Sequence, residues 1–360
     1  MNLNVLVLAG DGIGTEVTRE AVRVLRHVAQ KWGHDLKLSE GLLGGVAIHK
    51  TGTPFPDETA RLAADADATL MGAVGLPEFD SAPPEKRPEK GLLGIRKALG
   101  VYANLRPVRA YASQLDSSPL KNHLVEGTDM IIVRELTGGI YYGTPRGITE
   151  DGAETRAVNT MTYTRAEIER VSRMAFHLAQ ARRKQVTSVD KSNVLENSQL
   201  WRRVVIEVAK DYPDVKLDHL LVDNCAMQLV LNPRRFDVVL TENMFGDILS
   251  DEGAVLAGSI GMLPSASIGE RKPSGVWVGL YEPVHGSAPD IAGQNKANPL
   301  GAIGSVGAML AYSFGLKEEA NAVESAIETV LRSGKVTADL RPSGPPATTE
   351  QVGEAVCAAI

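Results

Sequence analysis

The chain contains 360 residues, of which 43% are hydrophobic and 23% are charged, and its net charge is −6. This composition is typical of an ordinary globular protein, and the length suffices for two domains with buried cores. A net negative charge argues against nucleic acid or an anionic membrane surface as the main partner. A negative protein can still hold a basic pocket, so the charge excludes these partners without naming a substrate.

The cysteines and the N-terminal segment both bear on the compartment. Cys225 and Cys357 form no pairing pattern and no Cys-x-x-Cys motif, which is typical of a reducing cytoplasm. The run 1–10 is apolar but lacks a charged n-region, so we interpret it as a first strand and not as a signal peptide. No stretch approaches the ~20 apolar residues that a membrane span needs. The sequence therefore predicts a cytoplasmic protein without a membrane partner.

Strand-like and helix-like runs alternate from one end of the chain to the other. The expected strands cover residues 3–9, 68–74, 130–134, 185–189, 217–222, 238–241 and 276–281. The expected helices cover residues 16–31, 165–182, 196–210, 245–256, 299–314, 317–333 and 348–360. Thr349 is the expected cap of the last helix. This alternation predicts an α/β fold with a mostly parallel central sheet.

Two segments break the alternation. Residues 77–88 are rich in proline and charge, which predicts a surface loop. Residues 138–163 combine aromatics, glycines and Thr or Asn with weak helical periodicity. We expect extended arms or hairpins there, which could pair with another subunit.

A glycine-rich loop, Gly10-Asp-Gly-Ile-Gly14, follows the first expected strand and precedes a helix. A dinucleotide-binding fingerprint requires a glycine at its sixth position, where this chain has Thr15. The match is partial, and a plain strand-to-helix turn explains it equally well. The loop therefore does not predict a standard Rossmann fold.

Two aspartates, Asp247 and Asp251, are spaced to share one face of a helix that Asn243 could cap. Carboxylates held this close repel one another unless a cation lies between them, and Mg²⁺ prefers such oxygen ligands. The alternative is a solvated acidic face near a helix N-terminus, where the helix dipole favours carboxylates. Spacing alone favours this alternative.

Other charged residues stand at the ends of expected strands. Arg134, Lys191 and Asp223 each end or follow an apolar run, as the aspartate pair does, and ligands of open α/β sheets gather at the carboxyl ends of strands. Together with Arg96 and Arg106, Arg134 supplies guanidinium groups suited to a di- or tricarboxylate. For any single arginine, a surface ion pair is an equal alternative.

The segment 282–293, Glu-Pro-Val-His-Gly-Ser-Ala-Pro-Asp-Ile-Ala-Gly, is dense in small residues that let a backbone approach a ligand closely. His285 offers a planar polar face, and Asp290 can accept hydrogen bonds from ribose hydroxyls. A structured loop without a ligand is the alternative interpretation.

These segments together resemble the β-decarboxylating dehydrogenases, the family of isopropylmalate and isocitrate dehydrogenases. The resemblance runs from the loop 10–14 to residues 337–339 and is most specific over 134–141, 243–253 and 282–293. Thr15 departs from it, because the family usually has proline there. The resemblance implies a pair of α/β domains that is not a Rossmann fold. The first domain is discontinuous (1–101 and 257–360) and carries most of the NAD site, and the second (102–256) carries the dimer interface, the arm and the metal ligands.

The resemblance also implies roles for individual residues. Tyr141 corresponds to the acid that protonates the enol after decarboxylation, and Lys191 to the residue that assists removal of the C2 hydroxyl proton. Asp247 and Asp251 correspond to Mg²⁺ or Mn²⁺ ligands. The neighbouring subunit of a homodimer supplies Lys191 and the further ligand Asp223. The implied substrate-binding residues are Glu89, Leu92, Leu93, Arg96, Arg106, Arg134, Val194 and Asp223.

The implied activity is oxidative decarboxylation of a small 2-hydroxy dicarboxylate. Apolar Leu92 and Leu93 would leave a third carboxylate unpaired, so the leucine-biosynthesis substrate 3-isopropylmalate is expected. D-malate, tartrate, homoisocitrate and longer alkylmalates remain alternatives, as does a non-catalytic regulatory subunit. Asp290 indicates NAD, because its charge would repel a 2′-phosphate. The implied NAD-binding residues are Ile13, Glu282, His285, Gly286, Ser287, Ala288, Asp290, Ile291 and Asn298.

Overall fold

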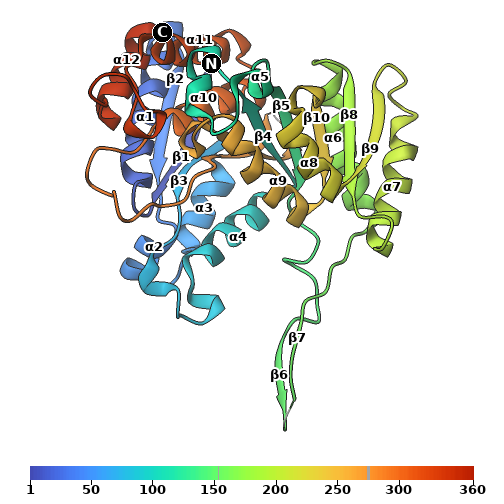
Figure 1. Cartoon of the computed structure of the whole chain (residues 1–360). Coiled ribbons are helices and arrows are strands. Elements are labelled where there is room, and N and C mark those ends of the chain that lie inside the picture. The colour runs from blue at the N-terminus through green and yellow to red at the C-terminus, as the bar shows by residue number, and fades with distance from the viewer. Residues whose placement is uncertain (153, 274–275) are drawn as a thin grey trace. The chain divides into compact units, whose positions relative to one another are not determined.

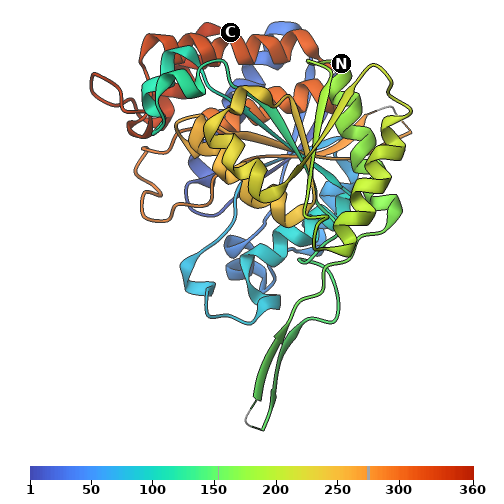
Figure 2. The same ribbon diagram turned by 45° about the vertical axis from the view of Figure 1, so that its right-hand side comes forward.

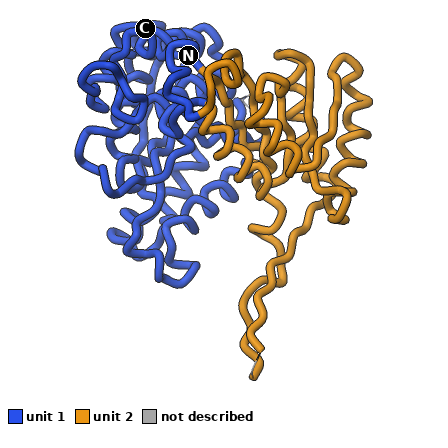
Figure 3. Tube along the Cα trace, viewed as in Figure 1, with its two compact units in different colours: residues 1–101, 111–119, 257–360 blue, residues 102–110, 120–256 orange. Residues whose placement is uncertain are grey.

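A computed structural model spans Met1–Ile360 and describes every residue except 153, 274 and 275. The chain divides into two compact units (Figure 3). Unit 1 comprises residues 1–101, 111–119 and 257–360, and unit 2 comprises residues 102–110 and 120–256. Each unit has mostly parallel strands in a sheet that helices flank, so the predicted α/β class is confirmed.

One short segment lies in a different unit from the one that the sequence predicted. Residues 111–119 were expected in the second domain. In the structure they belong to unit 1. The side chain of Gln114 donates to the carbonyl of Leu331 at 3.1 Å, and Ser117 Oγ donates to the carbonyl of Leu340 at 2.9 Å. These contacts with C-terminal elements attach the segment to unit 1.

The sheet of unit 1 is built on apolar strands. Its order is β2 (Asp35–Glu40), β1 (Asn2–Gly10), β3 (Ala68–Ala73), β12 (Trp277–Pro283) and β11 (Pro264–Arg271). The first four strands run parallel, and β11 pairs antiparallel with β12. Every residue of β3 is buried, as expected for a central parallel strand covered on both faces.

The helices of unit 1 include four that the apolar periodicity of the sequence predicted. The helices of the unit are α1 (Gly14–Trp32), α2 (Gly45–Thr51), α3 (Asp57–Asp65), α4 (Pro88–Leu99), α10 (Leu300–Tyr312), α11 (Lys317–Ser333) and α12 (Thr349–Ala359). Thr349 was predicted to cap α12, and this is wrong. Thr348 caps the helix, because its side chain accepts from the Gln351 N–H while the Gln351 side chain accepts from the Thr348 N–H.

The sheet of unit 2 brings several strand ends to one edge. Its order is β4 (Ala103–Arg109), β5 (Asp129–Glu135), β10 (Val238–Thr241), β8 (Gln185–Asp190) and β9 (Lys216–Leu221). All but β4 run parallel. The carboxyl ends of β5, β8, β9 and β10 therefore lie on the same side of the sheet.

The helices of unit 2 include two that start at this edge. They are α5 (Asn122–Val125), α6 (Arg165–Gln180), α7 (Glu196–Ala209), α8 (Val222–Leu231) and α9 (Asn243–Leu256). α8 starts directly after β9, and α9 starts two residues after β10. No helix of the described residues combines the length and apolar character needed to cross a bilayer.

The predicted extended arm is present in unit 2. Strands β6 (Gly147–Asp151) and β7 (Glu154–Val158) pair antiparallel and extend away from the rest of the unit (Figures 1 and 2). All of β6 is exposed, and Ile148 is 71% exposed. An isolated two-stranded hairpin is marginal in water, so an exposed apolar side chain on one suggests a surface that something else covers.

Candidate active site

The aspartate pair lies on α9, whose first turn is capped by Glu242. The Glu242 carboxylate accepts from the backbone N–H groups of Met244 at 3.1 Å and Phe245 at 2.7 Å. The prediction that Asn243 caps the helix is therefore wrong. Its side chain turns instead toward β5, where its Oδ1 accepts from Arg134.

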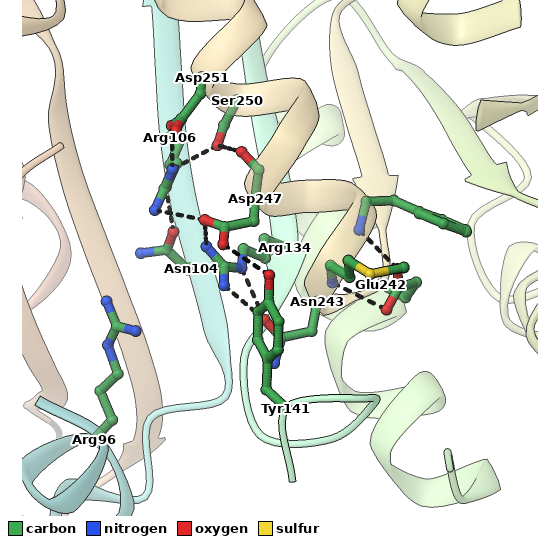
Figure 4. Close-up of polar contacts among 12 residues, drawn as sticks. Arg96, Asn104, Arg106, Arg134, Tyr141, Glu242, Asn243, Asp247, Ser250 and Asp251 are labelled. Atoms are coloured by element: carbon green, nitrogen blue, oxygen red, sulfur yellow. Dashed lines mark hydrogen bonds and ion pairs between the residues drawn. The ribbon is translucent and has the colours of Figure 1, made fainter. Parts of the chain in front are cut away.

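Asp247 and Asp251 lie on one face of α9 and both meet Arg106 (Figure 4). Arg106 Nη1 is 3.2 Å from Asp251 Oδ1, and Arg106 Nη2 is 3.7 Å from Asp247 Oδ1. Arg134 donates to the same Asp247 oxygen, and the Tyr141 hydroxyl donates to Asp247 Oδ2 at 3.0 Å. We call these five residues, Arg106, Arg134, Tyr141, Asp247 and Asp251, the aspartate–arginine cluster. Five predicted residues are thus brought together within unit 2.

The two arginines of this cluster are nearly buried, so their remaining N–H groups require partners. Arg106 donates to Asn104 Oδ1 at 2.9 Å and to Ser250 Oγ at 2.5 Å. Gly246 lets the Arg134 side chain lie against α9, because a Cβ on this residue would fall 2.7 Å from Arg134 Cβ. The glycine one residue before Asp247 therefore permits the close approach of guanidinium and carboxylate.

The environment of Tyr141 keeps its phenol protonated. Burial raises the pKa of Tyr141, and the neighbouring Asp247 carboxylate raises it further. Arg134 lies over the ring, 5.9 Å from its centroid. A protonated phenol at neutral pH can serve as a proton donor.

Lys191 and Asp223 form a separate group at the same edge of unit 2, which we call the lysine–aspartate pair. Lys191 Nζ lies 2.5 Å from Asp223 Oδ1. This lysine lowers the pKa of the Asp223 carboxyl. Lys191 directly follows β8, and its backbone N–H donates to Ser198 Oγ at 3.1 Å. Val194, three residues later, is 65% exposed.

The carboxylates of the two groups remain apart. Among the described residues, no three His, Cys, Asp or Glu side chains gather in an arrangement that could hold a metal ion. Asp247 and Asp251 offer oxygen ligands on one helix face, which suit a hard divalent cation. Asp223, the third predicted ligand, is engaged by Lys191 instead.

Two of the predicted cofactor residues, Ile13 and Ser287, connect the glycine-rich loop to the segment 282–293. The Ile13 N–H donates to the Ser287 carbonyl at 2.8 Å. Gly12 has a φ of +54°, and a Cβ there would lie 2.1 Å from the same carbonyl oxygen. The loop that failed the dinucleotide fingerprint is therefore joined by its backbone to the segment 282–293.

The His285 side chain, in the same segment, indicates that a ligand binds there. Its Nδ1 lies 2.9 Å from the Gly286 carbonyl oxygen, whereas its buried Nε2 has no hydrogen-bond partner. Burial lowers the pKa of His285, so the imidazole is neutral at pH 7. Buried polar atoms without partners are rare, and a nucleotide ring is one group that can meet such an atom. The residues present therefore fit a nucleotide cofactor.

The remaining predicted cofactor residues flank His285. Asn298 donates to Asp339 at 2.9 Å and caps the Leu300 N–H at 3.0 Å. Ala288 adopts a φ of +36°, and Asp290 is exposed, with its carbonyl accepting from Gln294. Ile291 is half-buried, whereas the exposed Asp290 side chain is accessible to a ligand.

Arg96 and Glu282 pair with each other inside unit 1, at 2.8 Å. The sequence assigned Arg96 to the substrate and Glu282 to the cofactor, and this contact places the two residues side by side. Arg96 lies on α4, which also carries other predicted substrate-binding residues. α4 holds Glu89, which is exposed, and half-buried Leu92 and Leu93, of which Leu92 packs against the hydrophobic core of the unit.

Two contacts of Arg106 were not predicted. Asn104 precedes it by two residues and therefore lies on the same face of β4, a spacing that could have pointed to it. Ser250 lies next to Asp251 in the sequence, but its contact with Arg106 depends on how α9 packs on β4. No local pattern reveals that packing.

Comparison with known proteins agrees with this geometry. The family model for isocitrate/isopropylmalate dehydrogenase matches residues 4–356. The chain belongs to this family. Among the relatives of this dehydrogenase family, 3-isopropylmalate dehydrogenase of Geobacillus kaustophilus is 59% identical over 343 residues, which cover 95% of this chain and 91% of that protein. The enzyme of the same name from Aquifex aeolicus is 54% identical, covering 94% and 92%.

Solved structures of the family have the same fold. Isocitrate dehydrogenase from Methylococcus capsulatus superposes with a TM-score of 0.87 at 34% identity, covering 99% of both chains. A β-decarboxylating dehydrogenase from Thermococcus kodakarensis gives 0.80 at 35% identity, covering 99% of this chain and 96% of that one. The predicted membership of the isocitrate/isopropylmalate dehydrogenase family is confirmed.

Proposed function

We propose that this dehydrogenase oxidatively decarboxylates 3-isopropylmalate to 4-methyl-2-oxopentanoate in leucine biosynthesis, as a cytoplasmic homodimer that uses NAD and Mg²⁺ or Mn²⁺. The aspartate–arginine cluster carries the proposal. It places two buried guanidinium groups, two carboxylates and a protonated phenol within one site. The name shared by the relatives from Geobacillus kaustophilus and Aquifex aeolicus supports the choice of substrate.

Each residue of the cluster and of the lysine–aspartate pair has a task in this reaction. Arg106 and Arg134 bind substrate carboxylate, because a guanidinium fork matches a carboxylate in a bidentate manner. In its neutral form Lys191 accepts the proton of the C2 hydroxyl, and Tyr141 donates a proton to carbon after CO₂ has left. Asp247 and Asp251, with Asp223 of the partner subunit, would hold the divalent cation, which acidifies the hydroxyl and stabilises negative charge on oxygen.

Exposed apolar residues of unit 2 support the homodimer. Met227 and Leu231 on α8 are 59% and 58% exposed, and Ile248 on α9 is 60% exposed. The adjacent helices α8 and α9 thus present apolar side chains that a second copy can cover. In such a dimer the lysine–aspartate pair of one chain completes the aspartate–arginine cluster of the other.

The cofactor assignment rests on the residues around Ser287 in unit 1, with NAD, when bound, accepting the hydride. Asp290 is the proposed selector against a 2′-phosphate. We expect Asp290→Arg to shift the ratio of kcat/KM for NAD⁺ and NADP⁺ toward NADP⁺ by about tenfold or more, because an opposite charge replaces a repulsive one. An unchanged ratio would refute Asp290 as the selector.

Substrate choice is tested by turnover. The purified protein with Mg²⁺ and NAD⁺ should reduce NAD⁺ with 3-isopropylmalate at a higher kcat/KM than with D-malate, tartrate, homoisocitrate or isocitrate. The half-buried leucines Leu92 and Leu93 favour a branched alkyl group over a third carboxylate. No turnover with 3-isopropylmalate, or a clear preference for another substrate of this panel, would overturn the proposal.

A further inference from the structure

Asn243 is not a member of the aspartate–arginine cluster, but it contacts both Arg134 and the turn that leads to Tyr141. It is buried, and its side chain makes three hydrogen bonds. Its Oδ1 accepts from Arg134 Nε at 2.9 Å and Arg134 Nη2 at 2.8 Å, and its Nδ2 donates to the Gly138 carbonyl at 3.0 Å. Figure 4 shows the amide beside the guanidinium that meets Asp247.

The backbone of Asn243 is itself fixed. The Tyr163 hydroxyl accepts from the Asn243 N–H at 3.0 Å and donates to Glu242 Oε2 at 3.0 Å. Burial raises the pKa of Tyr163, so this hydroxyl keeps its proton. Because Glu242 also caps α9, the start of the helix and the Asn243 side chain are held in one orientation.

The Gly138 peptide is held from a second direction. Glu135, which is fully buried, accepts from the Gly138 N–H at 2.8 Å and from the Thr137 N–H at 3.0 Å. The Gly139 N–H in turn donates to the Thr162 carbonyl at 3.0 Å. The turn that leads to Tyr141 is therefore bound to β5 on one side and to α9, through Asn243, on the other.

We propose that Asn243 is a positioning residue that couples the orientation of Arg134 to the turn carrying Tyr141. This role rests on the proposed function, since it concerns the substrate clamp and the proton donor of that reaction. The coupling requires a side chain that accepts on one side and donates on the other, which a primary amide does. A carboxylate only accepts, and alanine does neither.

Two variants separate the two contacts. Asn243→Asp keeps the acceptor for Arg134, loses the donor to Gly138, and is tolerated at a helix N-terminus. Asn243→Ala loses both contacts. Hydrogen–deuterium exchange of residues 137–142 and steady-state kinetics with 3-isopropylmalate are measured for both variants. Val186→Ala, in the buried core at the amino end of β8, is the control for lost stability.

We expect faster exchange of 137–142 in both Asn243 variants and not in Val186→Ala. Asn243→Asp should lower kcat about tenfold, the equivalent of one buried hydrogen bond, with KM within about threefold of wild type. Asn243→Ala should lower kcat and also raise KM about tenfold, because Arg134 loses its acceptor.

Wild-type exchange of 137–142 in Asn243→Asp would overturn the coupling, as would equal KM values in the two Asn243 variants. Kinetic changes no larger than those of Val186→Ala would overturn it as well. The exchange measurement needs no substrate. A wild-type enzyme inactive on 3-isopropylmalate would therefore refute the proposed function while the exchange result still decides the coupling.

Discussion

The two charged groups of unit 2 differ in how completely one chain fixes them. In the aspartate–arginine cluster, the side chains of Arg134 and Arg106 are only 5% and 10% exposed. In the lysine–aspartate pair, Lys191 is 28% and Asp223 is 64% exposed, and the charged ends meet mainly each other. Both groups stand at the same edge of one sheet, so the difference does not come from strand topology.

Two clusters of similar net charge can therefore differ in how much they depend on partners within the same chain. Buried charges need partners within the fold, and Arg106 has them in Asn104 and Ser250. An exposed ion pair contributes little to stability, because water screens it. In the proposed dimer, such a pair would be a half-site that acts on the cluster of the other chain.

The largest expected effect concerns Lys191. Lys191→Met should lower kcat about 1,000-fold, because it removes the proposed general base, and should leave the melting temperature nearly unchanged at this partly exposed position. Lys184→Met is the matched control, since it removes a surface lysine paired with Asp214 just before the same strand. Substantial turnover in Lys191→Met would refute the assignment.

A smaller effect is expected for Asp251, the more exposed carboxylate of the cluster. Asp251→Asn should weaken the apparent affinity for Mg²⁺ or Mn²⁺ at least about tenfold, because a neutral amide replaces an anionic ligand. The measurement is turnover of metal-stripped enzyme against added metal. Asp129→Asn, at the amino end of β5, should titrate as wild type does. Equal metal dependence in Asp251→Asn would remove this residue from the metal site.

The smallest effect concerns Asp223 itself. Lys191 lowers the pKa of Asp223, so Lys191→Met should raise that pKa toward its ordinary value, which a carboxyl-carbon NMR titration measures. A carboxylate with a depressed pKa stabilises the fold above its unfolded pKa and loses this contribution as the pH falls through its folded pKa. An Asp223 pKa that stays low in Lys191→Met would show that another group holds it.

Much of the fold was predictable because long runs carry strong periodicity. α1, α6 and α11 were expected within a few residues of their bounds. β2 and β11 were not expected, since β2 is half-exposed and polar and β11 has no apolar run. α4, with Gly91 and Gly94, was missed because glycine disfavours helices and only tertiary contacts offset that cost.

The residues of the candidate site were predictable by type, but their partners were not. Asp247 and Asp251 share a helix face by spacing alone, yet their contact with Arg106 depends on the packing of α9 against β4. Asn243 was predicted as a cap because asparagine favours that position. Glu242 takes the position instead, and the buried Arg134 needs the amide as an acceptor. Such competition between local and tertiary hydrogen bonds cannot be read from one segment.

In the proposed dimer, each active site combines the aspartate–arginine cluster of one chain with the lysine–aspartate pair of another. Co-expression of Lys191→Met and Asp247→Asn chains tests it directly, because each variant alone should be inactive. In a mixed dimer, one site would carry both substitutions and the other neither. Random pairing should then restore about a quarter of wild-type activity. Mixed dimers as inactive as either variant alone would contradict the shared site.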